Sequence, residues 1–558
     1  MTDRKAPACT LAAENGGFPS VQVWGTRGMV SSMHPAATAA AAQVLHEGGN
    51  AIDAAVTLGA AIAVTSHDWA GMAGDSAWLV YLAGPREYRH LDAYATCPAA
   101  TTPQLLVERF RLDRRRDAAA FREEPPGQRH MGVATGMVPG TPAAWCELAG
   151  RLGRLPLARL LEPAIALAEE GVVVNRYFAG ALERAVPKLV PFASTREALC
   201  SPGGELPREG ETLRQAELGA TLRRLARHGR AGFYSGETAA LIVEYCRRHG
   251  GVITREDLAA YEARWRPVLR GSYRGREIVV SGPPTSGAHV IQGLNILEGF
   301  DLAALGYHTA AALHLLIEAT KLCLADRRAL GGDPDFLPID LGAVLCKEEA
   351  RRLRETISGE RAAARGKRSL AGASTTHIVV ADAEGNLVSA TQTIGSAFGC
   401  GEVISGTGML MNDRTWWMAL DQGPNVVAPG HRANIGHAPT IVAADGRPCL
   451  ALGSPGGLGI VQYVIQTLVN VVDYGLDLQS AIEAPRFKIE DLASRVAIER
   501  RVDAGVRRAL AAMGHRVEEL PEWTDRVGGV EGISIDRRTG NLLGGYDPRR
   551  NSLAAGIH

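Results

Sequence analysis

The chain has 558 residues, and its 60 Lys and Arg residues balance its 60 Asp and Glu residues. A content of 46% hydrophobic and 22% charged residues is typical of a globular protein and excludes a disordered chain, a collagen and a coiled coil. Zero net charge also argues against a protein that coats nucleic acid or a membrane surface, because such binding relies on a basic field. We therefore expect neither nucleic acid nor a membrane as a partner.

Nine cysteines are scattered along the chain without a CxxC motif. Their odd number and wide spacing favour buried thiols in a reducing compartment over a disulfide scaffold or a zinc site. No apolar segment follows the first residues, as a signal peptide would require, and no apolar run approaches the roughly 18 residues that span a bilayer. The sequence as given predicts a soluble cytoplasmic protein, and a periplasmic location stays open if a leader has been removed.

The predicted elements begin and end at recognisable capping residues. Asn50 can cap the second helix, and Thr254 can cap a later one. Residues 347–372 show little periodicity and predict an exposed segment. In chain order we expect helices over 36–45 and 51–64, a strand over 77–82, a mainly helical region over 142–263, and a strand over 277–280 that turns into another helix after Gly287.

A hairpin signal follows the exposed segment. Two strand-like runs, 376–381 and 387–393, flank the turn Asp382-Ala383-Glu384-Gly385-Asn386. If the hairpin is centred on Glu384, Thr375 and Thr393 lie directly across from each other, with both hydroxyls on one face.

Gly456 and Gly457 follow a predicted strand over 449–452 and open a predicted helix over 458–471. Such a turn presents unpaired backbone N–H groups at the positive end of a helix dipole, which is how an oxyanion is held. A threonine hydroxyl is a weak nucleophile unless a base lies beside it. If the chain were cut before Thr375, the new α-amino group, with a reference pKa of about 7.7–8.0, would be that base.

Common catalytic signatures are absent from the sequence. There is no GxSxG elbow, no SxxK pair, no HExxH zinc motif, no Walker A motif and no GxGxxG fingerprint. The absence of these motifs argues against an α/β-hydrolase, a serine β-lactamase, and a nucleotide- or zinc-dependent enzyme.

A series of short motifs covers nearly the whole chain. In order, it includes Ser32-Met33-His34-Pro35, Gly48 to Ala55, Gly136-Met137-Val138-Pro139-Gly140, Phe233-Tyr234-Ser235-Gly236, Pro283-Pro284-Thr285-Ser286-Gly287, Gly332-Asp333-Pro334-Asp335-Phe336, Thr375-Thr376-His377 and Gly453-Ser454-Pro455-Gly456-Gly457. In this order the motifs resemble those of the γ-glutamyltransferases and their acylase relatives, within the N-terminal nucleophile hydrolases. The subgroup that the chain looks most like is the cephalosporin acylases.

The resemblance implies an α+β fold, a four-layer αββα sandwich formed from a precursor that cleaves itself between Ser374 and Thr375. The products, an α chain of residues 1–374 and a β chain of residues 375–558, would stay together as a heterodimer in one intertwined domain.

The resemblance also implies roles for four residues. Thr375 would be the nucleophile of both cleavage and catalysis, and Thr393 would hydrogen-bond it. Gly456 and Gly457 would form the oxyanion hole. The implied reaction is attack on a small-molecule amide and release through an acyl-enzyme, without a metal or an organic cofactor.

The sequence departs from the family where glutamyl-transferring members hold the amino-acid head of the substrate. Tyr94 replaces the arginine that binds the α-carboxylate, and Trp417 replaces the acidic residue that binds the α-ammonium. The asparagine two residues after the second threonine falls on Gly395, and a pair of serines falls on Ile435-Gly436. An unpaired zwitterion in such a pocket costs several kcal/mol, so we expect an acyl chain without an α-amino group.

Glutaryl, which is glutamyl without its amino group, fits this expectation. It also fits the cephalosporin acylases, which remove a glutaryl side chain from 7-aminocephalosporanic acid derivatives. The aromatic wall of the pocket would be Tyr94, Trp416 and Trp417. The terminal carboxylate could be met by one of three side chains, although loop arginines are more often solvated: Arg414, Arg432 or His437. Weak γ-glutamyl hydrolysis or transfer would be a side activity.

Three alternatives stay open. The first is an oxamate-type amidohydrolase with a small acidic substrate, and the second is an ordinary γ-glutamyltransferase, which Tyr94 and Trp417 disfavour. The third is an uncleaved binding protein on the same scaffold, which would have no need of a threonine nucleophile beside an oxyanion hole.

Overall fold

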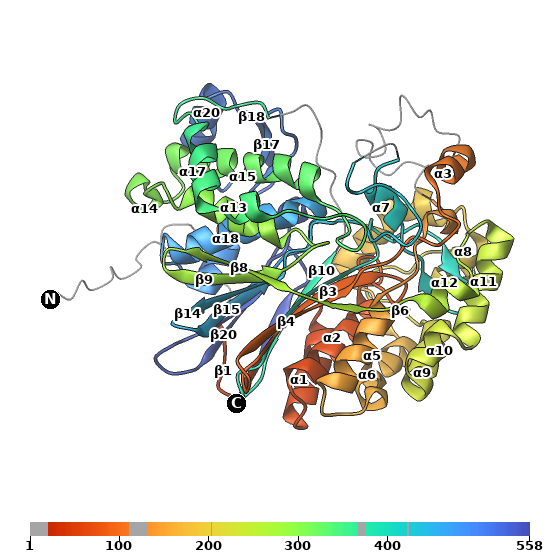
Figure 1. Cartoon of the computed structure of the whole chain (residues 1–558). Helices are drawn as coiled ribbons and strands as arrows, with labels where there is room; N and C mark the ends of the chain where they lie inside the picture. The colour runs from red at the N-terminus through yellow and green to blue at the C-terminus, as the bar shows by residue number, and fades with distance from the viewer. Residues whose placement is uncertain (1–20, 111–130, 202, 366–374, 421–422) are drawn as a thin grey trace.

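Two seven-stranded sheets form the centre of the computed structural model (Figure 1), which describes residues 21–110, 131–201, 203–365, 375–420 and 423–558. In spatial order the first sheet consists of β1 (Val23–Gly25), β20 (Leu542–Gly545), β19 (Glu531–Ile535), β15 (Arg447–Gly453), β14 (Thr440–Ala444), β9 (Arg276–Ser281) and β8 (Val268–Tyr273). The second consists of β21 (Leu553–Ile557), β2 (Gly28–Ser32), β10 (Thr376–Ala381), β11 (Leu387–Thr393), β3 (Asp75–Leu82), β4 (Glu87–Ala93) and β7 (Arg264–Arg266).

The two sheets pack face to face, and strands from before and after residue 375 lie side by side in both of them. Side chains alternate along β10 between the two faces of the second sheet. Ile378 and Val380 join the core under the helices, whereas Val379 and Ala381 join the apolar layer between the sheets. His377 and Thr375 share the parity of Val379, so they face the other sheet.

Helices cover the outer faces of both sheets (Figure 1). The second sheet carries α1 (Pro35–His46), α2 (Ala51–Thr65), α5 (Thr141–Arg151), α6 (Leu157–Glu170), α9 (Ala216–His228), α10 (Arg230–Tyr234), α11 (Glu237–His249) and α12 (Arg255–Ala260), with α3 (Pro103–Phe110), α7 (Arg176–Leu189) and α8 (Ala193–Leu199) at one end. The first sheet carries α13 (Gly287–Leu297), α14 (Leu302–Leu305), α15 (Ala310–Leu330), α16 (Gly342–Leu345), α17 (Lys347–Glu355), α18 (Ile460–Val472), α19 (Leu478–Glu483) and α20 (Ala504–Ala512).

The predicted four-layer αββα class is confirmed, as are the predicted helix starts at Asn50 and Thr254, each of which forms a capping box. One prediction was wrong in part: residues 347–355 form α17 rather than an irregular segment. Ala350 and Leu353, three residues apart among charged neighbours, supply the apolar stripe that packs α17 on the core. Residues 366–372 lie outside the described part of the chain.

Short pairs and turns complete the chain: β5 (Val172–Val173) with β6 (Thr212–Leu213), β12 (Val403–Ile404) with β13 (Met409–Leu410), and the sheet of β16 (Phe487–Ile489), β17 (Arg495–Glu499) and β18 (Arg516–Leu520). Within the described residues, no helix combines the length and the apolar character that a bilayer crossing would need.

Candidate active site

The predicted hairpin register is confirmed. Strands β10 and β11 pair Thr376 with Gln392, which continues to Thr375 opposite Thr393, and the Thr375 hydroxyl donates to the Thr393 hydroxyl at 3.5 Å. The backbone N–H of Gly395 also donates to the Thr393 hydroxyl, at 3.0 Å. Thr375 is 2% exposed, so its hydroxyl lies in a desolvated position with a hydrogen-bonding neighbour.

His377 links this hairpin to the opposite sheet. Its Nε2 lies 3.1 Å from the Ser389 hydroxyl, which donates to the Leu452 carbonyl, so Nε2 must carry the proton that it shares with Ser389. Its Nδ1 then accepts from the Thr391 hydroxyl, at 3.0 Å. Burial lowers the pKa of His377 to about 3, which keeps the ring neutral. The ring therefore acts as a spacer between the sheets.

Gly453 sits directly against this spacer, because a Cβ at that position would lie 2.2 Å from the His377 ring. Strand β15 ends at Gly453 and continues into Ser454-Pro455-Gly456-Gly457, so the packing of His377 brings the glycine turn to the Thr375 end of the hairpin. Gly456 and Gly457 have φ values of 121° and 58°, in the region that favours glycine, and they lead into α18. The predicted turn between a strand and a helix is therefore present at Gly456 and Gly457.

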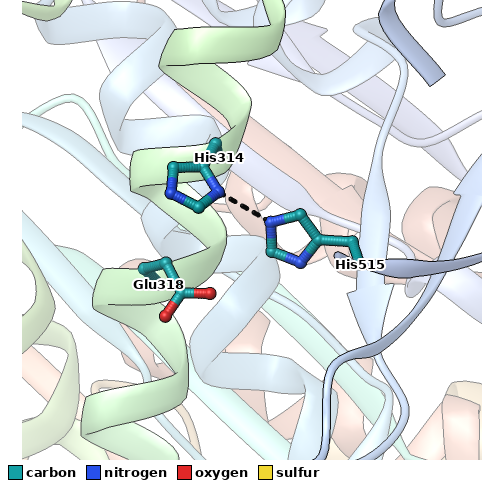
Figure 2. Close-up of side chains that lie close together, drawn as sticks. All are labelled: His314, Glu318 and His515. Carbon is teal, nitrogen blue, oxygen red and sulfur yellow. Dashed lines mark hydrogen bonds between the residues drawn. The ribbon is translucent and has the colours of Figure 1, made fainter. Parts of the chain in front are cut away.

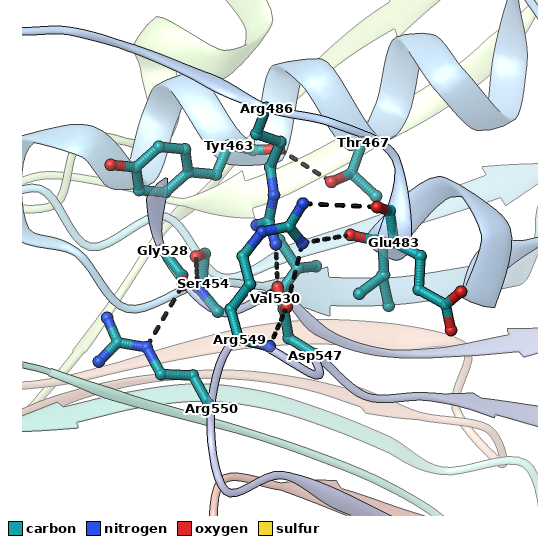
Figure 3. Close-up of polar contacts among 12 residues, drawn as sticks. Ser454, Tyr463, Thr467, Glu483, Arg486, Gly528, Val530, Asp547, Arg549 and Arg550 are labelled. Carbon is teal, nitrogen blue, oxygen red and sulfur yellow. Dashed lines mark hydrogen bonds and ion pairs between the residues drawn. The ribbon is translucent and has the colours of Figure 1, made fainter. Parts of the chain in front are cut away.

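A buried polar network contacts the glycine turn at Ser454 (Figure 3). The Gly529 N–H donates to the Ser454 hydroxyl at 3.3 Å, and Arg550 Nε donates to the Gly528 carbonyl at 3.3 Å. The next N–H, that of Val530, donates to Asp547 at 2.8 Å. Asp547 in turn pairs with two further arginines, Arg486 and Arg549. Although burial raises the pKa of Asp547, these two guanidinium groups hold it below the usual value.

Arg414 is buried, although arginines in loops are usually exposed to solvent. It is 2% exposed and forms a two-point ion pair with Asp75, with Nη2 at 2.7 Å from Oδ1 and Nε at 2.6 Å from Oδ2. Asp75 is the strand partner of Thr393 in β3 and β11, so the ion pair lies directly beside the threonine pair.

Arg432 is likewise buried, at 3% exposure. It reaches the Glu262 carbonyl at 2.8 Å and the Asp335 carboxylate at 3.1 Å. The expectation of solvated arginines was therefore wrong for both Arg414 and Arg432, because partners distant in sequence neutralise them.

Two of the three aromatic candidates are buried in the apolar core. Tyr94 is fully buried and Trp416 is 5% exposed, both within one apolar cluster, whereas Trp417 is half-buried. The His437 ring lies 5.3 Å from that of Tyr94, and burial lowers the pKa of His437 well below its usual value. Neither the Tyr94 hydroxyl nor His437 Nδ1 has a hydrogen-bond partner among the described residues.

Sequence reasoning missed two acidic residues. Asp75 holds Arg414, and Asp413 accepts the Ser396 N–H at 3.0 Å and the Trp417 indole N–H at 3.4 Å. The only sequence signal for Asp413 is its place in the loop that also holds Trp417. Ser374, the other side of the predicted cleavage site, lies outside the described residues.

Comparisons with known proteins agree with this architecture. The sequence matches the family described as gamma-glutamyltranspeptidase over residues 37–557. The acylase ACY 1 proenzyme of Pseudomonas sp. (strain SE83) is 37% identical over 92% of this chain and 90% of the relative, and the glutathione hydrolase proenzyme of Escherichia coli (strain K12) is 33% identical over 99% and 95%. The crystal structure of the cephalosporin acylase from Bacillus halodurans has a TM-score of 0.88 at 29% identity, covering 100% of this chain and 99% of that one. The chain therefore belongs to the gamma-glutamyltranspeptidase family of amide hydrolases.

Proposed function

We propose that the chain is a self-cleaving amidohydrolase whose nucleophile is Thr375. The observation that carries the proposal is the buried Thr375–Thr393 hydroxyl contact on the sheet interface, next to the end of β15. In the cleavage step, the Thr375 hydroxyl attacks the Ser374 carbonyl carbon, and the amide nitrogen leaves as the α-amino group of Thr375. Water then hydrolyses the resulting ester and frees the chains 1–374 and 375–558.

The same hydroxyl then attacks the substrate amide. The α-amino group accepts the hydroxyl proton and passes a proton to the departing amine. Backbone N–H groups of Gly456 and Gly457 stabilise the tetrahedral oxyanion, and removal of one such donor typically costs about 10²–10³ in rate. Water hydrolyses the acyl-enzyme, or an amine takes up the acyl group. Thr393 positions the nucleophile through the contact at 3.5 Å.

For the substrate we propose a glutaryl-type acyl group, as in glutaryl-7-aminocephalosporanic acid. Tyr94 and Trp417 replace the charged residues that would hold an amino-acid head, and Arg414 is already paired with Asp75. The Tyr94 hydroxyl and His437 Nδ1, which have no hydrogen-bond partner in the described part of the chain, are polar atoms of the kind that a ligand or water satisfies. The relatives named acylase and cephalosporin acylase support this choice.

A mass measurement tests the nucleophile. Purified parent protein should give two chains that divide between Ser374 and Thr375 under denaturing conditions, and Thr375→Ala should give one chain. Thr376→Val is the matched control, because its hydroxyl only donates to the Gln392 carbonyl at 2.8 Å, so it should still cleave. A single uncut chain from the parent would overturn the proposal and leave an uncleaved binding protein.

Substrate choice is tested separately on the cleaved enzyme. We expect glutaryl-p-nitroanilide to be hydrolysed with a higher kcat/KM than γ-glutamyl-p-nitroanilide. The second candidate function, γ-glutamyl hydrolysis or transfer, rests on the E. coli glutathione hydrolase relative, which matches 99% of this chain. The opposite order of kcat/KM would select that function. Activity on oxamate alone would select the small-substrate alternative.

A further inference from the structure

A second cluster of buried polar side chains lies in the helical layer outside the first sheet (Figure 2). His314 and Glu318 are one turn apart on the same face of α15, and His515 immediately precedes β18. His314 and Glu318 are fully buried, and His515 is 2% exposed. One possible ligand atom from each residue lies within 4.8 Å of the others. The active-site mechanism uses none of the three.

The hydrogen bonds fix the tautomers of the two histidines. His314 Nε2 lies 2.7 Å from the Ser358 carbonyl, which can only accept, so Nε2 carries the proton and Nδ1 is bare. His314 Nδ1 lies 2.8 Å from His515 Nε2, which must therefore be the donor. His515 Nδ1 has no hydrogen-bond partner within the described ranges.

Glu318 divides its two oxygens between different roles. Oε1 accepts from the Lys321 ammonium and, at 3.3 Å, from the Ala363 N–H. Oε2 is buried without a hydrogen-bond partner among the described residues. A buried carboxylate oxygen with no donor is costly unless a cation or another donor meets it.

We propose that His314 Nδ1, His515 Nε2 and Glu318 Oε2 bind a divalent transition-metal ion of the Zn²⁺ class. Two imidazoles and one carboxylate are a donor set typical of zinc. The bond from His314 Nε2 to a backbone carbonyl is the outer contact that orients a ligating histidine. On binding, the metal takes the place of the proton shared by the two rings, and that proton moves to His515 Nδ1. Tetrahedral zinc holds its ligand atoms about 3.3 Å apart, so the two rings separate by about half an ångström.

The site would tie down the chain ahead of the predicted cleavage junction. Its members already bind the segment 358–363 through the Ser358 carbonyl and the Ala363 N–H, and Lys321 donates to the Ala363 carbonyl at 3.0 Å. The metal would therefore join α15, the start of β18 and this segment. After the proposed cleavage, it would hold residues 358–363 of the α chain in place.

A substitution at Lys321 distinguishes a metal site from a cluster that is held by hydrogen bonds alone. Its ammonium competes with a metal for the charge of Glu318. Lys321→Met should therefore bind Zn²⁺ at least tenfold more tightly than the parent if the cluster is a metal site. A cluster that only exchanges hydrogen bonds would bind Zn²⁺ in neither protein.

The experiment uses the full chain, stripped with chelator and dialysed against Zn²⁺. We expect about one Zn²⁺ per chain by elemental analysis, a tetrahedral Co²⁺ absorption spectrum in the cobalt form, and a higher Tm with metal. His314→Gln and His515→Gln should lose the ion, and His46→Gln, an exposed histidine, should keep it. If the histidine variants do not fold, the parent spectrum and Tm shift decide. A parent without bound Zn²⁺ and without a Co²⁺ spectrum would overturn the proposal.

Discussion

Removal of the Arg414 guanidinium should destabilise the protein strongly, because it leaves the buried Asp75 carboxylate without its counter-charge. The side chains of the pair are 2% and 1% exposed, and two contacts of 2.6 and 2.7 Å join them. Breaking a buried ion pair by removal of one partner typically costs about 3–5 kcal/mol. We expect Arg414→Met to lower the free energy of unfolding by that amount near pH 8.

The loss should shrink as the pH falls. Burial already raises the pKa of Asp75 with its partner present, and without Arg414 the carboxyl should take up a proton more readily. A protonated carboxyl is neutral and costs less to bury, so the destabilisation should be smaller at pH 5 than at pH 8. Asp75→Asn combined with Arg414→Met should likewise recover part of the loss.

Urea unfolding of the parent, of Arg414→Met, of Asp75→Asn and of the double variant measures these effects. The matched control is Arg537→Met, which breaks an exposed pair with Asp445 whose side chains are 55% and 81% exposed. That change should cost less than about 1 kcal/mol. An equally small loss for Arg414→Met would refute the reasoning.

Three further changes test the glycine turn, a buried carboxyl and the pocket. Gly456→Ala should lower the hydrolysis rate about 100-fold, because φ is 121° and the new Cβ would lie 2.7 Å from the Tyr463 ring. Gly475→Ala, at a turn where no described residue lies within 4 Å of the new Cβ, should leave kcat unchanged. Burial raises the pKa of Asp68 from 3.8 to about 7, so folding stability falls as the pH rises between these values. Asp68→Asn should therefore raise the free energy of unfolding by up to about 4 kcal/mol at pH 8 and change it little at pH 4, as measured by urea unfolding. Trp417→Asp should raise the ratio of γ-glutamyl to glutaryl hydrolysis about tenfold, measured as kcat/KM, which corresponds to about 1.4 kcal/mol of transition-state preference.

Local sequence determined what could be predicted about the hairpin. The Asp382 side chain accepts the backbone N–H groups of Glu384 and Asn386, both at 3.0 Å, so the turn is fixed within five residues. A turn fixed in this way sets the strand register, and the register brings Thr375 opposite Thr393. The same reasoning predicted the helix cap at Asn50, whose partner Asp53 is three residues away.

Partners that are distant in sequence could not be predicted. Arg414 meets Asp75 across 339 positions, and nothing near Arg414 in the sequence indicates that Asp75 is its partner. Residue type alone favours an exposed arginine, so the sequence-based expectation failed where the fold supplied the counter-charge. The cluster of His314 and His515 shows the same limit, because 201 positions separate the two rings.

The proposed departures from the glutamyl-binding pattern depend on one another, and this interdependence limits single reversions. A Cβ at Gly395 would lie 1.9 Å from an Asp413 carboxylate oxygen, and Asp413 accepts the indole N–H of Trp417 at 3.4 Å. Tyr94 is fully buried against His437, and the charges that act on it are two carboxylates, Asp75 and Asp92, and two guanidinium groups, Arg414 and Arg327. Arg414 already pairs with Asp75, so an arginine at position 94 would add a buried cation to a set of charges that is already matched. A zwitterionic head therefore needs several simultaneous changes, and a single Trp417→Asp should shift preference without converting the enzyme.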